Sequence, residues 1–181
     1  MGEFRFDEAR IQGSVHMPML HATGQVSGDG VIAEKSFDEG FEFYCQGLQA
    51  VGFRMNRCRI DGCLDVNAAV IENQFSLLEA DIGAFRMPRA LRAQDLVADS
   101  MWLNNTVLRG QLDLNGARLT GALFASGIRI LADNVCAISA FDAQFGQLDF
   151  GEARVRGWLD LSRTEVAGPL RLNRARLLYP G

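Results

Sequence analysis

Apolar residues recur along most of this chain in pairs whose members lie one residue apart. Between residues 110 and 130 the pairs are Leu112 and Leu114, Ala117 and Leu119, Leu123 and Ala125, and Ile128 and Ile130. Alternation within a pair is typical of a short strand with one buried face, and the Asn, Gly, Thr and Ser residues between pairs favour turns. The pattern therefore predicts strands of two or three residues separated by corners.

The pairs continue without a gap from residue 53 to residue 177. Their second members recur every five or six residues and are all apolar: Met55, Ile60, Val66, Ile71, Leu77, Ile82, Met87, Ala93, Ala98, Leu103, Leu108, Leu114, Leu119, Ala125, Ile130, Val135, Ala140, Phe145, Phe150, Val155, Leu161, Val166, Leu172 and Leu177. Among the first members only Thr106, Asp133 and Thr164 are polar. Because an unpaired buried carboxylate is costly, we expect a bulge that turns Asp133 outward; a buried functional carboxylate is the alternative.

The period of the pairs predicts a four-sided coil. Every fourth second member, such as Met55, Leu77, Ala98 and Leu119, follows the previous one by 21 or 22 residues. This spacing predicts an all-β parallel solenoid of about eight coils of about 21 residues, because helical repeats require longer runs at a spacing of 3.6. We expect one domain over 1–181, with irregular N-terminal coils in 1–52, regular coils in 53–177 and a short tail in 178–181.

Two five-residue segments carry a resemblance to a known family. Leu112-Asp-Leu-Asn-Gly116 and Ala117-Arg-Leu-Thr-Gly121 resemble the motif of the pentapeptide-repeat proteins, although Phe53, Phe75 and Phe85 are large for their position. The resemblance implies a right-handed quadrilateral parallel β-helix. The family includes DNA mimics that bind gyrase, so inhibition or protection of a type II topoisomerase is an alternative function.

Charge is spread unevenly along the chain. The formal net charge is −4, with eight acids and three bases in residues 1–50 but six arginines and three acids in residues 151–181. Arginines are nearly as frequent as acids at outward positions, which weakens the case for DNA mimicry. The basic C-terminal coil has neither lysines nor interleaved aromatic residues, so we expect no direct contact with nucleic acid.

Few residues suggest catalysis. His16 and His21 are the only histidines, and the four cysteines lack a metal-binding spacing. We therefore expect neither an enzyme nor a cofactor or metal site, and the weaker alternative is a ligand site beside Asp29 on an irregular, protruding corner in residues 23–40. The sequence shows no apolar run of membrane-spanning length and no basic-then-apolar leader, so a cytoplasmic protein of bacterial type is expected.

Two apolar surfaces remain as candidates for contact with a protein partner. Trp102 and Phe124 are predicted to stack outward one coil apart, flanked by Val97 and Val107, either as a partner site or beneath the irregular N-terminal loop.

The second surface is the C-terminal end of the rod. Only four residues follow Leu177, too few to cover the last coil, so Leu172, Leu177 and Tyr179 are predicted to mediate a homodimer unless the natural chain continues. The predicted function is a non-enzymatic interaction or scaffold module.

Overall fold

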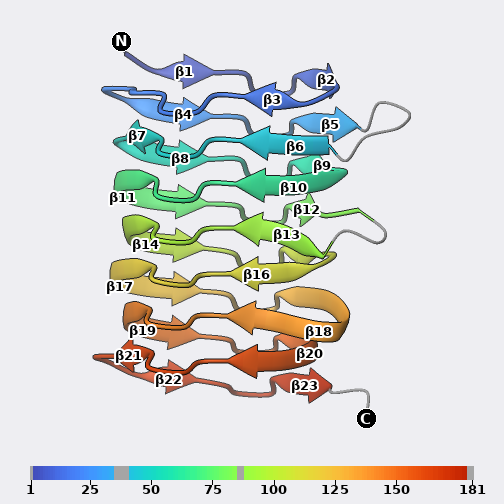
Figure 1. The fold of residues 1–181 in the computed structure, drawn as a ribbon, viewed down its shortest axis with the longest axis vertical. Coiled ribbons are helices and arrows are strands. Elements are labelled where there is room, and N and C mark those ends of the chain that lie inside the picture. The colour runs from blue at the N-terminus through green and yellow to red at the C-terminus, as the bar shows by residue number, and fades with distance from the viewer. Residues whose placement is uncertain (1, 35–40, 85–87, 179–181) are drawn as a thin grey trace.

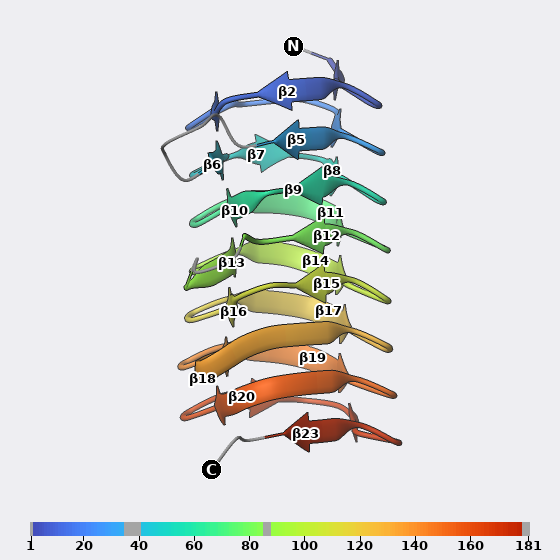
Figure 2. The same cartoon turned by 90° about the vertical axis from the view of Figure 1, so that its right-hand side faces the viewer.

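The computed structural model describes residues 2–34, 41–84 and 88–178, and only the backbone of residues 41, 42 and 133–135. The described residues form strands, turns and bends, with no helix among them, and the strands stack as the parallel coils of a β-solenoid (Figure 1). The predicted fold class is confirmed. The chain winds about seven times along one axis, and its two ends lie at opposite ends of the rod (Figures 1 and 2). Since no described segment is helical, no helix there is available to span a membrane.

All strand pairs are parallel and they form two sheets. The first sheet contains β1 (Phe4–Arg5), β4 (Gln25–Ser27), β7 (Gln49–Ala50), β8 (Gly52–Arg54), β11 (Val70–Ser76), β14 (Val97–Trp102), β17 (Arg118–Phe124), β19 (Gln144–Asp149), β21 (Glu165–Val166) and β22 (Leu170–Arg171). The second sheet contains β2 (Arg10–Gln12), β3 (Val15–His16), β5 (Ile32–Glu34), β6 (Phe41–Tyr44), β9 (Arg59–Ile60), β10 (Gly62–Asp65), β12 (Asp81–Ile82), β13 (Arg89–Arg92), β15 (Val107–Leu108), β16 (Gln111–Asp113), β18 (Arg129–Ser139), β20 (Arg154–Asp160) and β23 (Arg176–Leu178).

Inward side chains stack in four columns, one on each side of the coil. The first column is Phe4, Val26, Phe53, Phe75, Met101, Leu123, Leu148 and Leu170. The second is Ile11, Ala33, Ile60, Ile82, Leu108, Ile130, Val155 and Leu177. The third is Val15, Phe43, Leu64, Leu91, Leu112, Ile138 and Leu159. The fourth is Ala50, Ile71, Ala98, Leu119, Phe145 and Val166.

The predicted stacking order is wrong beyond the second regular coil. Leu77 does not stack against Ala98, because its N–H donates to Trp102 O beside Leu103. A 21 to 22 residue spacing does hold in alternate coils, but in the coils between them the equivalent residue lies 25 to 28 positions away. The extra residues always enter between the second and third columns: Leu64 follows Ile60 by four positions, whereas Leu91 follows Ile82 by nine.

The true repeat is therefore a double coil of about 48 residues. Each short coil turns the corner between the second and third columns with a heptad that has Gly at its fourth position and an inward aliphatic residue at its second and sixth. The four heptads are Arg10–His16, Arg59–Asp65, Val107–Asp113 and Arg154–Asp160, which begin 49, 48 and 47 residues apart. The sequence contained this signal, but the shorter five-residue rhythm concealed it.

The polar inward positions are satisfied within the core. The Thr106 hydroxyl is fully buried and donates to Leu77 O, and the Thr164 hydroxyl donates to Ala140 O at 2.6 Å. Each threonine thus bonds to the preceding coil, and its hydroxyl is not left without a hydrogen-bond partner. The side chain of Asp133 lies outside the described residues, so the expected bulge at this position stays a prediction.

The N-terminal coils are more regular than expected. Residues 25–27 and 32–34 of the predicted protruding corner form β4 and β5, which pair in register with β8 and β9. Val26, Val31 and Ala33 are buried in the common core. The rest of that corner, residues 35–40, lies outside the described residues.

The first prediction tests the assigned faces on one strand, β17. Leu119 is 2% exposed in the fourth column, whereas neighbouring Arg118 points to solvent. Leu119→Asp should unfold or aggregate the protein, because it places a charge between stacked coils, and Arg118→Asp should change the free energy of unfolding by no more than about 0.5 kcal/mol. Thermal melting followed by circular dichroism checks this; equal melting temperatures would contradict the register.

The second prediction concerns the corners, where one residue in each turn adopts a left-handed conformation. Ala68 has φ of 54° and is exposed, while the neighbouring Ala69 is buried. Ala68→Gly should leave the melting temperature unchanged or raise it by a few degrees, since glycine removes the strain of a positive φ.

Ala69→Gly is the matched control and should lower the melting temperature, because its methyl group is lost from the core. The reverse change at an equivalent corner, Gly116→Ala (φ +68°), should be destabilising as well, because the new Cβ would meet Asp95 Oδ1. A destabilised Ala68→Gly variant would show that strain at these corners is negligible.

Candidate functional site

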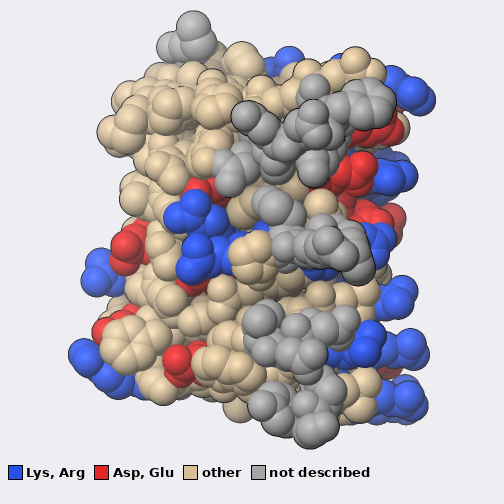
Figure 3. Space-filling view, turned by 45° about the vertical axis from the view of Figure 1, so that its right-hand side comes forward, with Lys and Arg blue, Asp and Glu red and all other residues tan. Residues whose placement is uncertain are grey.

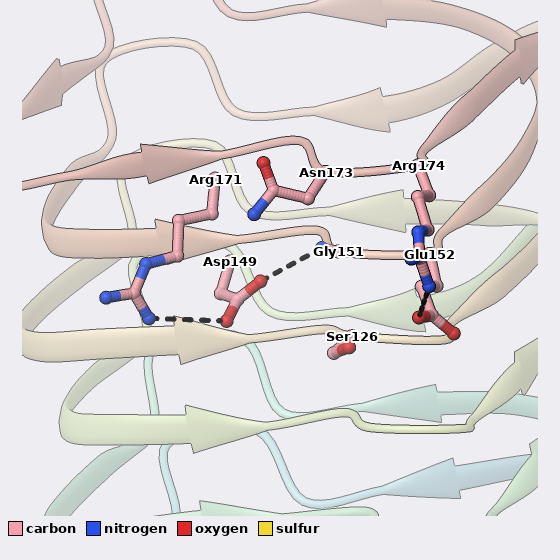
Figure 4. Close-up of a pocket in the computed structure, with 7 residues that line it drawn as sticks. All are labelled: Ser126, Asp149, Gly151, Glu152, Arg171, Asn173 and Arg174. Atoms are coloured by element: carbon pink, nitrogen blue, oxygen red, sulfur yellow. Dashed lines mark hydrogen bonds and ion pairs between the residues drawn. The ribbon is translucent and has the colours of Figure 1, made fainter.

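The core of the rod is filled by side chains, so the candidate sites lie on its surface. One hollow is lined by Ser126, Asp149, Gly151, Glu152, Arg171, Asn173 and Arg174 (Figure 4). Its charged groups bind one another: Asp149 accepts from Gly151 N at 2.9 Å and faces Arg171, and Glu152 pairs with Arg174 at 3.5 Å. The two ion pairs join consecutive coils, and neither carboxylate in this hollow is without a partner.

A second hollow lies beside Asp29, where the sequence allowed a ligand site. Asp7, Glu8, Asp29, Gly30 and Arg57 line it. Asp7 accepts from the Ser27 hydroxyl and from Asp29 N, and the Ser27 bond lowers the pKa of Asp7. Asp29 in turn accepts from Asn56 N and pairs with Arg54 at 2.8 Å. Both carboxylates therefore serve as links between corners of successive coils.

The cysteines and His16, which could be reactive, also lie in structural surroundings. All four cysteines are buried free thiols, and burial raises the pKa of both Cys45 and Cys58 to about 12, which disfavours the nucleophilic thiolate. His16 lies against Tyr44, with ring centroids 4.9 Å apart. Among residues 2–34, 41–84 and 88–178, no three His, Cys, Asp or Glu side chains are grouped to hold a metal ion.

The structure brings the two rings of the predicted aromatic pair into contact. Trp102 and Phe124 are directly paired on β14 and β17, their ring centroids are 4.4 Å apart, and both are half-buried. The described N-terminal residues do not cover them, since Ser27 lies three coils away in the same column. Val97 and Val107 stand in neighbouring columns, so the four residues occupy three successive sides of the rod.

The other predicted contact surface is the C-terminal end, where inward side chains lose their cover. Leu170 and Leu177 are 52% and 50% exposed, although Leu148 and Val155, their counterparts one coil earlier, are 2% and 0% exposed. Leu161 and Leu172 are exposed in the same way. Tyr179 lies outside the described residues.

Two buried carboxylates were missed by sequence reasoning. Asp65 is 1% exposed and accepts from Gln46 Nε2 at 2.8 Å, Arg92 Nη1 at 2.7 Å and Asn67 N at 3.0 Å. Asp113, one double coil later, has the matching contact from Gln94 Nε2 at 2.9 Å. Their spacing of 48 residues was the available signal. Because each carboxylate is enclosed by donors, both act as structural anchors of a corner.

Comparison with known proteins adds no relative to these observations. The chain matches no family model, and neither a curated protein nor a solved structure is similar to it at a significant level.

Proposed function

We propose that this chain is a non-enzymatic interaction or scaffold module that contacts a protein partner through the C-terminal end of the rod. The carrying observation is the exposure of Leu161, Leu170, Leu172 and Leu177, which occupy core positions in the coil. Clustered apolar surface of this kind is typical of contact sites, and the strands at the end of a solenoid also offer unpaired backbone groups.

The favoured partner at this end is a second copy of the chain. A two-fold contact buries the same leucines on both copies and closes the assembly, whereas head-to-tail stacking would continue as a fibre. Arg171, Arg174 and Arg176 oppose this contact by like charge, but Arg171 and Arg174 are each balanced by an acid of the preceding coil, Asp149 and Glu152.

The charge pattern gives less support to DNA mimicry. A mimic requires a continuous anionic strip, but on this rod acids of one coil repeatedly pair with arginines of another. Such pairs are Asp65–Arg92, Asp81–Arg109, Asp142–Arg163, Asp149–Arg171 and Glu152–Arg174. We therefore do not retain topoisomerase binding as a second candidate.

The third prediction tests the end contact. Light scattering at micromolar concentration should give twice the chain mass of 19.9 kDa, and Leu177→Glu should return the protein to a monomer, because the new carboxylate would be buried against its mate. Val70→Glu is the matched control, since Val70 is a comparably exposed residue on the side of the rod. A monomeric parent protein, or a dimer that survives Leu177→Glu, would refute this contact.

The fourth prediction tests whether Trp102 and Phe124 form a surface instead of a core. Replacing both with Ser should reduce the free energy of unfolding by about 1 kcal/mol, the typical value of a close aromatic pair. Phe53 and Phe75 are fully buried, with ring centroids 4.9 Å apart. Replacing both of these with Ser should reduce the free energy of unfolding by about 3–5 kcal/mol for each ring. Urea unfolding compares the two double variants; similar losses would assign the Trp102 pair to the core.

A further inference from the structure

The outward face of β20 carries a basic and aromatic run. Arg154 and Arg156 are exposed on either side of the buried Val155, so their side chains project from the same side of the rod. Trp158 follows the buried Gly157, at which the strand turns the corner toward the third column. Trp158 is 43% exposed. Successive outward residues of a strand are about 6.6 Å apart, so the run places two guanidinium groups close together on one side of the rod and an indole just past the corner that ends this side.

Arginines on the neighbouring strands widen this run into a patch. Arg129 on β18 and Arg176 on β23 are paired in register with Arg154, so three exposed arginines stand in one column at a strand spacing of about 4.8 Å. The three strands lie side by side near the C-terminal end of the rod (Figure 2). We call Arg129, Arg154, Arg156, Trp158 and Arg176 the β20 patch.

The arginines of this column lack the ion pairs that neutralise other arginines on the rod. Among the described side chains, Arg129, Arg154 and Arg176 make neither an ion pair nor a hydrogen bond, in contrast to Arg92, which is held by Asp65. The nearby Glu152 is paired with Arg174. Like charges directly opposed on neighbouring strands are destabilising, so this column has a cost that an anionic ligand would remove.

The two halves of this edge of the rod differ in the charges that they carry. In Figure 3, basic side chains follow the right-hand edge, and acidic side chains are interspersed with them mainly in its upper half. The acids in the same two outward columns are Glu34, Asp61 and Asp81, all from the N-terminal half of the rod. The β20 patch therefore forms the basic half of an edge whose other half carries both signs.

We propose that the β20 patch binds a single-stranded nucleic acid, with the arginines on phosphates and Trp158 stacked on a base. Guanidinium groups match the geometry of phosphate oxygens and can bind two at once. Aromatic side chains on a positively charged surface are the usual platform for unpaired bases, whose faces are not accessible in a duplex. The exposed indole at the edge of the arginine patch therefore favours a single strand over a duplex or an acidic protein.

This inference does not depend on the proposed protein contact, and it revises the expectation of no nucleic acid binding. That expectation rested on the absence of lysines and of interleaved aromatic residues in the basic C-terminal coil. The structure places Trp158 on β20 two residues after Arg156, directly past the bend at Gly157.

Fluorescence anisotropy with a labelled oligothymidylate of about 16 nucleotides at low salt tests the proposal. Trp158→Ala should weaken binding by about tenfold, since base stacking is lost. Arg154→Gln should weaken binding and reduce the slope of log K against log salt by about 0.7, the value for one phosphate contact on a single strand. Arg118→Gln, which removes an exposed arginine from another side of the rod, is the matched control and should have little effect.

A second readout reports contact with the indole itself. Trp102 and Trp158 are the only tryptophans, so in a Trp102→Phe background the oligonucleotide should quench the emission of Trp158. The same sequence as a duplex should bind more weakly and quench less. Circular dichroism melting should show that every variant remains folded, because the altered side chains are exposed or, for Trp102, replaced by another aromatic ring.

Three outcomes would overturn the proposal. The first is no binding of the oligonucleotide at low salt. The second is equal weakening by Arg118→Gln and Arg154→Gln, which would reveal diffuse attraction instead of a site. The third is binding that is insensitive to Trp158→Ala, or that is stronger for heparin with the same quenching, which would assign the patch to polyanions in general.

Discussion

In-register stacking of inward side chains is the constraint on which the rest of this structure depends. Each coil has too few residues to enclose a core of its own, so its apolar side chains are covered only by the coils before and after it. The stacked rings of Phe53 and Phe75 show the geometry: identical positions on parallel strands bring like side chains into contact. Burial of this kind stabilises every interior coil, whereas Leu170 and Leu177 in the last described coil are about half exposed.

The same constraint explains where polar residues occur. A corner must turn the chain while the inward columns stay aligned, and the side-chain oxygens of Asp7, Asp29 and Asn56 accept from the backbone of the next coil at successive corners. Asp65 and Asp113 make comparable links at another corner. Most acids of the described residues are thereby used as structural acceptors, and the exposed leucines at the rod's end and the unpaired arginines stand out as groups without such a role.

The sequence predicted the strand rhythm, the four-sided parallel coil and the contact between Trp102 and Phe124, because each depends on local alternation and on the spacing of one short coil. It did not predict the stacking order, since the extra residues between Ile82 and Leu91 are partly apolar and continue the five-residue rhythm. Nor did it predict that β20 continues through the corner at Gly157 as one strand, with Trp158 directly after the bend. A glycine at the bend of a continuous strand and a glycine in a turn cannot be separated by composition alone.

The alternation of short and long coils has a consequence for how such a rod can change its length. Removal of a single coil would place two short heptads, or two long connections, directly above one another, and the third column would then be offset from the second. Removal or addition of a complete double coil keeps every column aligned. The unit by which this architecture can be lengthened, shortened or recombined is therefore about 48 residues, and the heptads of the short coils mark the natural joints.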